Sequence, residues 1–377
     1  MQIREVESTL VRVPVRRPTR MATRVLTQRD YLLVTVRAGG LEGTGYAYIG
    51  TAGGEIAREA VRTQLCSVLL GADADDIVGA WERMYQETLL SGRRGAVLRA
   101  MSAVDVALWD LLGKRAGLPL AVLLGGGLAP VPAYASGGYY VVDPSRTPAE
   151  QVTDEITANR VQGFVDHKIK VGGLSPQEDA ERVAAAAAVI GGTGRLALDA
   201  NNAYSTVKEA VRIVRLFQEA AAETGVWWIE EPLRPDDVAG YAELAQRLDI
   251  PVATGEIAQS RWEFRELIER RAADILQPDA GVLGGVTEFL RVVRAADTAA
   301  IPVAPHWHAN LHVHLAAASP NCLAIEHFTL DKDIYNFETV LTPETRAGFR
   351  DGTVLVPERP GLGIEFDAEQ VRRLTVA

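Results

Sequence analysis

The chain has 377 residues, enough for two or three domains or for one large barrel with additions. Hydrophobic residues make up 47% of it and charged residues 23%, which is typical of globular proteins and excludes a disordered, fibrous or collagen-like chain. The formal net charge of −10, with no basic block, argues against nucleic acid as a partner.

The first residues, Met1 to Glu7, alternate charged and apolar side chains and lack the apolar core of a signal peptide. No later stretch reaches the roughly 18 apolar residues that a membrane span needs. We therefore expect a cytoplasmic protein with no membrane partner. An acidic chain can still act on anionic small molecules, because cations or a bound metal reverse the charge inside one pocket.

The first third of the chain predicts an α+β unit. Residues 3–13 and 31–36 alternate as strands do, and Gly39 and Gly40 form a turn after the second of them. Over residues 54–112 the apolar spacing becomes helical.

A glycine and proline cluster, Leu123 to Gly127 followed by Pro130 and Pro132, predicts a domain boundary near residue 126. Beyond it, short apolar runs alternate with helical stretches, the pattern of βα units around a parallel sheet. The runs cover residues 131–136, 165–170, 196–201, 226–231, 252–256, 275–279, 301–306 and 322–326. Eight runs predict a (β/α) barrel.

Catalytic groups of such barrels lie at the carboxyl ends of the strands, so the last residues of each run are the candidate site. From Lys170 onward these ends follow one another at spacings of 20 to 31 residues, about one βα unit each. They carry Lys168 and Lys170, Asp199, Glu230, Glu256, Asp279, His306 and Glu326.

Lys168 and Lys170 are two residues apart, so on a strand both point to the same face, here the barrel interior. Two adjacent ammonium groups lower each other's pKa, which predicts a base that works near neutral pH. The alternative is a strand end with two solvated lysines.

Asp199, Glu230 and Glu256 end three consecutive runs, and three converging carboxylates repel one another unless a cation neutralises them. Oxygen-only ligands suit Mg²⁺. Each acid alone would be a surface or ion-paired residue, and it is the regular spacing that favours a metal site. On the next two strands Asp279 is placed to orient the imidazole of His306, an arrangement used for general bases.

Short motifs occur in a fixed order along the chain. They are Ala-Leu-Trp-Asp at 107–110, Leu-Leu-Gly-Gly at 123–126, Lys-Ile-Lys at 168–170, Asp-Ala-Asn at 199–201, Trp-Ile-Glu-Glu-Pro at 228–232, Thr-Gly-Glu at 254–256, Gln-Pro-Asp at 277–279 with Gly-Gly at 284–285, and Pro-His at 305–306. With these motifs the chain resembles the enolase superfamily, in particular its mandelate racemase subgroup, over essentially its whole length.

The resemblance implies an α/β fold, a modified TIM barrel of the (β/α)7β type with an α+β capping domain. The expected division is a capping domain at 1–125, a catalytic barrel at 126–330, and a C-terminal segment at 331–377 that packs back on the cap. It also implies removal of the proton next to a carboxylate, with Mg²⁺ stabilising the ene-diolate. One Mg²⁺ per subunit is expected. Glu231 should point to the other face, and the implied ligands are Asp199, Glu230 and Glu256.

The same resemblance implies the roles of the remaining strand-end residues. Lys170 is the base on one face of the substrate, and Lys168 supports it and helps to neutralise the substrate carboxylate. His306, held by Asp279, is the acid or base on the opposite face. Glu326 donates a hydrogen bond to the substrate carboxylate as the enolate forms, which requires that Glu326 be protonated.

Substrate specificity is expected to come from two polar cap loops, near residues 16–24 and 46–51, which suit a polyhydroxylated acid or diacid. The alternative is that the arginines of the first loop are only solvated. The other histidines after His306 are expected to be structural, with His308 as the exception. The expected substrate-binding residues are Arg20, Tyr48, Tyr139, Asn201 and His308.

We therefore predict a Mg²⁺-dependent dehydratase that converts an acid sugar, an aldonate or aldarate, into a 2-keto-3-deoxy acid. Bases on both faces also permit a racemase or epimerase of a 2-hydroxy acid, and a cycloisomerase of a sugar lactone is a third possibility. A non-catalytic binding relative is disfavoured because both bases and all three metal acids are present. The expected partners are a small-molecule carboxylate and further copies of the chain, with no nucleic acid.

Overall fold

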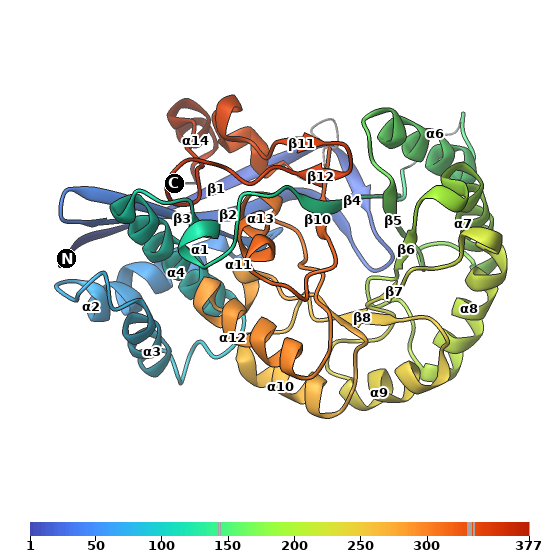
Figure 1. The fold of residues 1–377 in the computed structure, drawn as a ribbon, viewed down its shortest axis with the longest axis horizontal. Helices are drawn as coiled ribbons and strands as arrows, with labels where there is room; N and C mark the ends of the chain where they lie inside the picture. Colours follow the sequence, from blue (N-terminus) through green and yellow to red (C-terminus); the bar gives the residue numbers. More distant parts are fainter. Residues whose placement is uncertain (142, 144, 330–333, 335, 377) are drawn as a thin grey trace.

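The computed structural model describes residues 1–377 except 142, 144, 330–333, 335 and 377. It contains a three-stranded antiparallel sheet with its helices and a largely parallel barrel sheet ringed by helices (Figure 1). The predicted α/β fold, a barrel with an α+β cap, is confirmed. The predicted boundary between residues 330 and 331 lies outside the described residues. None of the described helices is both long and apolar enough to cross a membrane.

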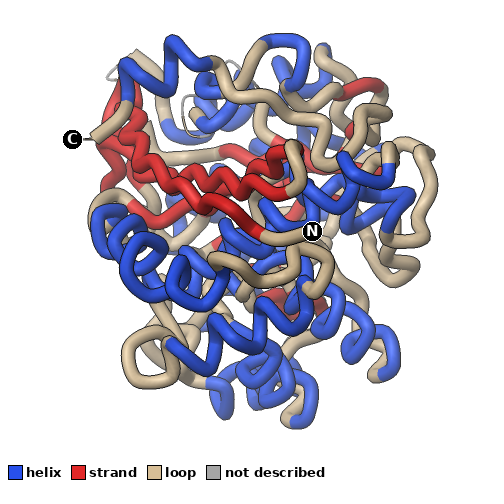
Figure 2. The backbone as a smooth tube through the Cα atoms, turned by 90° about the vertical axis from the view of Figure 1, so that its left-hand side faces the viewer, coloured by secondary structure: helices blue, strands red, loops and turns tan. Residues whose placement is uncertain are grey.

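The cap sheet has the order β1-β2-β3. Gly39 and Gly40, with φ of 58° and 79°, close its second hairpin, because a tight hairpin turn needs left-handed backbone at both positions. Figure 2 shows these long strands, in red, running side by side across the upper half of the view. The strands are β1 (Ile3–Arg20), β2 (Val25–Ala38) and β3 (Leu41–Gly50).

The longest cap helix packs directly on β3. A Cβ atom at Gly43 would lie 2.1 Å from the carbonyl oxygen of Ala107, and one at Gly45 would lie 2.1 Å from that of Ala103, so only glycine allows this approach. The helical elements of the cap are α1 (Gly54–Ala60), the π-helical turn Val61–Leu65, α2 (Cys66–Leu69), α3 (Ile77–Glu87), α4 (Ala96–Ala116) and α5 (Leu120–Leu123).

The barrel strands pair in parallel in chain order, and β10 pairs with β4 to complete the ring. The strands are β4 (Val131–Gly137), β5 (Asp166–Lys170), β6 (Leu196–Asp199), β7 (Ile229–Glu230), β8 (Val252–Thr254), β9 (Ile275–Leu276) and β10 (Ile325–His327). The run at 301–306, predicted as the seventh strand, contributes only bridges, from Val303 to Leu276 and to Cys322.

Helices connect successive strand positions of the barrel, and β10 leads into the C-terminal segment. The helices are α6 (Pro148–Val161), α7 (Pro176–Ile190), α8 (Val207–Ala220), α9 (Val238–Arg247), α10 (Ser260–Glu269), α11 (Ala280–Leu283), α12 (Gly285–Thr298) and α13 (Ala309–Ala317). The sequence sets where the first two begin: Thr147 with Glu150, and Ser175 with Glu178, form capping boxes, each with a proline at the start of the helix.

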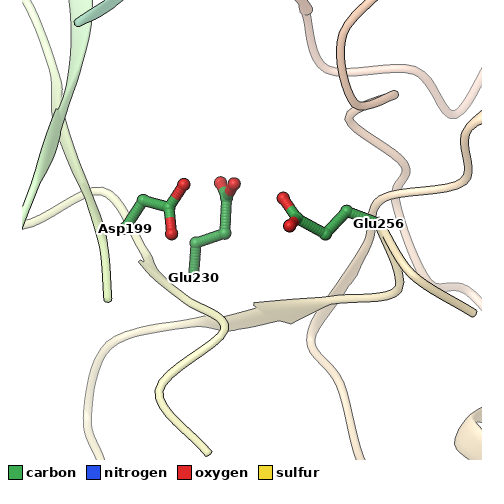
Figure 3. A group of neighbouring side chains, drawn as sticks. All are labelled: Asp199, Glu230 and Glu256. Carbon is green, nitrogen blue, oxygen red and sulfur yellow. The ribbon is translucent and has the colours of Figure 1, made fainter. Parts of the chain in front are cut away.

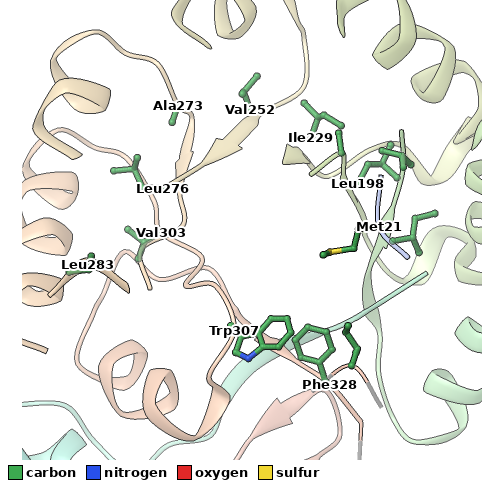
Figure 4. Close-up of a cluster of buried hydrophobic side chains, with 14 of the residues drawn as sticks. Met21, Leu198, Ile229, Val252, Ala273, Leu276, Leu283, Val303, Trp307 and Phe328 are labelled. Carbon is green, nitrogen blue, oxygen red and sulfur yellow. The ribbon is translucent and has the colours of Figure 1, made fainter. Parts of the chain in front are cut away.

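Alternation along the short strands decides which side chains reach the barrel interior. Figure 4 shows Leu198, Ile229 and Val252 on the outer side of the strands, toward the helices, and all three are buried there. Their neighbours Asp199 and Glu230 therefore point inward, and these two residues are directly paired in the parallel register. The hydrophobic packing of the barrel thus brings charged strand ends together.

The C-terminal segment contacts both parts of the molecule. Strands β11 (Phe349–Arg350) and β12 (Thr353–Val354) extend the barrel sheet, because β12 pairs antiparallel with β4. Helix α14 (Ala368–Leu374) lies beside β1, and the backbone N–H of Val376 donates to the carbonyl oxygen of Leu10 at 2.8 Å. Through these contacts the described part of the segment lies against β1 of the cap sheet and against β4 of the barrel.

Candidate active site

Three buried carboxylates meet inside the barrel. Asp199 ends β6, Glu230 ends β7 and Glu256 follows β8, and one oxygen from each lies within 4.8 Å of the others (Figure 3). The first two side chains are fully buried, so their repulsion has little solvent screening. An oxygen-only donor set of this kind fits Mg²⁺, and these three residues would hold it.

Glu230 is held in position by donors on both of its oxygens. Trp228 Nε1 and Gln277 Nε2 donate to Oε2 at 3.0 and 2.6 Å, and Lys168 Nζ donates to Oε1 at 2.5 Å. Burial raises the pKa of Glu230 to about 8, against the opposing effect of the Lys168 ammonium. The orientation of the Glu230 carboxylate is therefore set by neighbours that the sequence pattern did not single out for that role.

The adjacent Glu231 belongs to a different network. Its backbone has a φ of 44°, and its carboxylate accepts hydrogen bonds from Thr254 Oγ1 at 2.7 Å, Gly255 N at 3.0 Å and Asn202 Nδ2 at 2.7 Å. These contacts hold Glu231 apart from the carboxylate cluster and fix the loops at the ends of β6 and β8.

The two lysines of β5 are buried against carboxylates. Lys168 Nζ lies 2.9 Å from Glu326 Oε1 and also contacts Glu230, while Lys170 Nζ contacts Asp199. Burial lowers the pKa of Lys170, but Asp199, Tyr139 and Glu256 together outweigh it and the net pKa is raised. The pKa of Lys168 is raised in the same way, mainly by Glu230 and Glu326. The predicted net lowering of the pKa is wrong: Lys168 does lower the pKa of Lys170, but the carboxylates that contact the two ammonium groups raise both pKa values by more.

Asp279 and His306 form the predicted pair. Asp279 Oδ2 lies 2.9 Å from His306 Nδ1, and Oδ1 accepts a hydrogen bond from Gly281 N at 2.7 Å at the start of α11. Nε2 of His306 lies 3.4 Å from Glu256 Oε2. Burial lowers the pKa of His306, but Glu256 and Asp279 outweigh it and raise the pKa to about 9.

Glu326, on β10, is held as an acceptor. Trp307 N donates to its Oε2 at 2.7 Å, and the Lys168 ammonium contacts its other oxygen. Burial raises the pKa of Glu326, but the cationic groups of Lys168, His306 and Lys170 together outweigh burial and the net pKa is lowered. The expectation of a protonated Glu326 that donates a hydrogen bond is therefore wrong for this arrangement.

The order of the strands places Lys170 and His306 on two sides of the carboxylate cluster. Lys170 ends β5, the carboxylates follow on β6, β7 and β8, and His306 comes after the bridge position at Val303. A substrate bound over the carboxylates would have a proton-transfer group on each flank. Such an arrangement removes a proton on one side and donates one on the other.

A cavity of about 80 Å³ that opens to solvent lies beside this cluster, between the cap and the barrel. Of the predicted substrate-binding residues, Tyr48, Tyr139 and Asn201 line it, together with Lys170 and His306. The Oδ1 of Asn201 and the hydroxyl of Tyr139 are buried there and have no hydrogen-bond partner among the described residues. Both atoms belong to residues of the cavity wall and are unsatisfied within the described part of the chain.

Two predicted substrate-binding residues lie elsewhere and are not among the described residues that line the cavity. β1 continues as far as Arg20, which the sequence analysis placed in a loop, and Arg20 Nη2 donates to the carbonyl oxygen of Gly173 at 3.0 Å. His308 is buried at the start of α13, with its ring 5.0 Å from that of Tyr46 and 6.2 Å from that of Phe337. The structure gives both residues protein contacts instead of an exposed position in the cavity.

Three arginines of the cap line the cavity although the sequence pattern did not predict them as substrate-binding residues. Arg24 lies in the predicted polar loop, Arg29 lies on β2 and Arg99 lies on α4. Arg99 carried a usable signal, because it is a lone cation in the apolar run Ala96 to Val104. An unexplained charge on an otherwise apolar helix face indicates a partner outside that helix.

Two family models match the chain. The model described as mandelate racemase/muconate lactonizing enzyme, N-terminal domain, matches residues 3–125. The model described as enolase C-terminal domain-like matches residues 151–371, which is more than half of the chain.

Three relatives of known activity share about a third of their residues with the chain. An arabinonate dehydratase of Saccharolobus solfataricus is 37% identical over 305 residues, 78% of this chain and 77% of that protein. An L-talarate/galactarate dehydratase of Salmonella typhimurium is 35% identical, over 93% of this chain and 83% of that protein. A 3,6-anhydro-alpha-L-galactonate cycloisomerase of Streptomyces coelicolor is 33% identical, over 99% of each.

Solved structures agree over the full chain. A racemase from Streptomyces coelicolor with bound magnesium superposes with a TM-score of 0.90 and 31% identity, covering 99% of this chain and all of that one. An L-talarate dehydratase from a Polaromonas species, complexed with Mg and L-glucarate, gives a TM-score of 0.89 and 35% identity, covering 100% and 98%.

Proposed function

The chain belongs to the mandelate racemase/muconate lactonizing enzyme family of the enolase superfamily, and from this premise we propose that it is a Mg²⁺-dependent acid-sugar dehydratase. As a hydro-lyase, it removes water from an aldonate or aldarate and yields a 2-keto-3-deoxy acid. Two of the relatives described above carry out this class of reaction, which supports the assignment.

The observation that carries the proposal is the polarity of the cavity. Asn201 Oδ1 and the Tyr139 hydroxyl are buried without partners among the described residues, and they need hydrogen-bonding groups from the substrate. A 2-hydroxy acid with an aromatic or alkyl side chain would leave them unpaired, at a cost of about 1–3 kcal/mol for each. The hydroxyl groups of an acid sugar satisfy them.

The two proton transfers of the reaction are assigned to Lys170 on one side of the substrate and His306 on the other. Either Lys170 or His306 takes the C2 proton; the C3–O bond then breaks, the departing hydroxyl takes a proton and leaves as water, and the resulting enol becomes the 2-keto acid. Asp279 holds the imidazole of His306 through Nδ1, so that Nε2 faces the cavity side. Lys168 stabilises negative charge on the substrate carboxylate. A divalent cation held by Asp199, Glu230 and Glu256 would neutralise the charge that grows on that carboxylate.

The proposal is tested by incubating the protein with Mg²⁺ and a library of acid sugars in D₂O. Exchange of the α-proton together with keto-acid formation is the expected result, and absence of exchange throughout the library would show that the enzyme assignment is wrong. Loss of optical rotation without keto acid would select a racemase. Opening of a lactone or anhydro ring without loss of water would select a cycloisomerase, the activity of a relative that aligns over 99% of the chain.

Single variants then show which of Lys170 and His306 removes the C2 proton. Lys170→Ala and His306→Asn should each remove dehydration, and the variant that keeps α-proton exchange identifies the residue that does not abstract the proton. Lys208→Ala, an exposed lysine of α8, serves as the control for a surface substitution. Equal residual dehydration in both active-site variants would contradict a two-residue mechanism.

We further propose that the protein is a cytoplasmic homo-oligomer whose other partner is only its small-molecule carboxylate substrate. Light scattering coupled to gel filtration measures the mass in solution against the 40.7 kDa of one chain. A mass equal to that of one chain would contradict the oligomer.

A further inference from the structure

Three arginines of the cap, Arg24, Arg29 and Arg99, line the same cavity as the proton-transfer residues. We propose that they form a subsite for a second carboxylate at the far end of the substrate, so that the enzyme prefers aldarates, which are diacids, to aldonates. This inference rests on the proposed dehydratase function and specifies the substrate of that site.

The side chain of Arg29 is held in place by a hydrogen bond and by two aromatic rings. Its side chain is 2% exposed, its Nε donates to the carbonyl oxygen of Ile334 at 2.7 Å, and its guanidinium carbon lies 4.3 Å from the ring centre of Trp307 and 4.9 Å from that of Tyr48. Stacking on aromatic rings fixes the plane of a guanidinium and leaves its edge for a planar anion. Arg29 forms no ion pair with any carboxylate among the described residues.

Arg99 reaches the cavity from a different element. It lies on α4, and its Nη1 donates to the carbonyl oxygen of Tyr48 at 2.6 Å. Like Arg29, it has no carboxylate partner in the part of the chain that the structure describes. Burial lowers its pKa, a cost that a bound anion would offset. A partly buried cation that has only a backbone hydrogen bond among the described residues is therefore a candidate ligand-binding group.

Arg24 belongs to the turn between β1 and β2, which lies over the mouth of the barrel. Thr23 Oγ1 donates to the carbonyl oxygen of Asn201 at 3.1 Å, and Tyr140 N donates to that of Arg20 at 3.0 Å, so the turn is tied to the barrel on both sides of Arg24. Arg24 itself is exposed at the entrance. It therefore completes the cationic lining on the solvent side.

The charge balance of the cavity favours a dianion. The barrel contributes five carboxylates, which two lysines and one divalent cation leave with a single negative charge, or with none when His306 carries a proton. The three arginines therefore leave an excess of two or three positive charges, and the carboxylates concerned are those of Asp199, Glu230, Glu256, Asp279 and Glu326. An aldarate offsets two of these charges and an aldonate only one, so the charge of the cavity favours the diacid for either state of His306.

Aldarates and aldonates differ in only one group. The last carbon carries a carboxylate in the first and a hydroxymethyl group in the second, while the stereocentres between are shared in pairs such as galactarate and galactonate or glucarate and gluconate. A guanidinium binds a carboxylate through two parallel hydrogen bonds, and it has no such match with a hydroxymethyl group. Matched pairs therefore report on this subsite alone.

The test measures binding and turnover for both matched pairs. Calorimetric titration of the Mg²⁺-loaded Lys170→Ala variant reads affinity without turnover, and kcat/KM is measured on the wild type. In whichever pair contains a substrate, the aldarate should bind at least ~10-fold more tightly than the aldonate of the same configuration. Arg29→Gln or Arg99→Gln, placed in the same background, should weaken aldarate binding by roughly 10²-fold and aldonate binding by less than ~10-fold.

Arg24→Gln changes an exposed side chain and is the test to use if Arg29→Gln or Arg99→Gln fails to fold. It should reduce the preference for aldarate over aldonate by ~10-fold. Arg294→Gln, an exposed arginine of α12, is the matched control and should change neither affinity. Equal affinities for aldarate and aldonate, or equal losses for both in the arginine variants, would overturn the subsite while leaving dehydration intact. Absence of α-proton exchange with every acid sugar would instead reject the proposed function.

Discussion

Replacing Gln277 with leucine removes one of the two donors that hold Glu230 Oε2. Gln277 Nε2 donates to this oxygen at 2.6 Å, and Trp228 Nε1 donates at 3.0 Å. A hydrogen bond to a charged group contributes about 1.5–3 kcal/mol, and each 1.4 kcal/mol corresponds to about a tenfold change in an equilibrium constant. Loss of an outer contact of this kind typically lowers metal affinity by about 10- to 100-fold. We expect the dissociation constant for Mg²⁺ to rise by roughly this factor.

The assay is calorimetric titration of Mg²⁺ into chelator-treated protein, without substrate, alongside circular dichroism to verify folding. Gln259→Leu is the matched control, because Gln259 is also buried and loses hydrogen bonds to the cap backbone at Gly95, yet it contacts no carboxylate of the cluster. Its Mg²⁺ affinity should stay within about threefold of wild type. An unchanged affinity in a folded Gln277→Leu variant would refute the reasoning that Gln277 positions a metal ligand.

Three further substitutions test other parts of the structure. Asp279→Asn removes the carboxylate that orients His306, and should lower kcat by about 10²- to 10⁴-fold with little change in Mg²⁺ affinity; retained kcat would contradict the pairing. Gly43→Ala places a Cβ atom 2.1 Å from the carbonyl oxygen of Ala107 and should destabilise the cap by more than about 2 kcal/mol in chemical unfolding, with equal stability as the contrary result. Burial lowers the pKa of His314 to about 4, so on acidification the unfolded state binds a proton before the folded state does. The free energy of unfolding should therefore fall by up to about 3 kcal/mol between pH 6.5 and pH 4. His314→Gln should reduce this pH dependence, and an unchanged pH dependence would show that His314 does not cause it.

Much of the barrel is readable from the sequence because its strands repeat one physical rule. An apolar residue packs outward on the helices, and the next residue points inward. Once Ile229 is recognised as an outward core residue, the inward position of Glu230 follows from the alternation. The lengths of the strands are less predictable. The apolar run at 301–306 forms only the bridges of Val303, since hydrogen bonding depends on the neighbouring strands and not on the run itself.

Electrostatics could not be predicted from spacing along the chain. Lys168 and Lys170 are neighbours in sequence, which suggests that they repel and lower each other's pKa, but Asp199 and Glu326 come from other strands and dominate in space. The same contact reverses the expectation for Glu326. A pKa depends on the whole set of charges around a group, and that set exists only once the barrel has closed.

The cap residues show why specificity is harder to predict than chemistry. Asp199 and Glu230 occupy equivalent positions of a repeating βα unit. Arg29 comes from a cap strand and Arg99 from a cap helix, and the residue pattern of neither element predicts that both line one cavity. Because the cationic lining and the metal ligands lie on separate elements, changes in one need not disturb the backbone that positions the other. The cap can therefore change which acid sugar is bound while the barrel keeps the same proton chemistry, and relatives with a shared barrel can act on different substrates. On this argument the substrate of such a chain is best inferred from the unpaired charges of its cap, and the reaction type from the strand ends of its barrel.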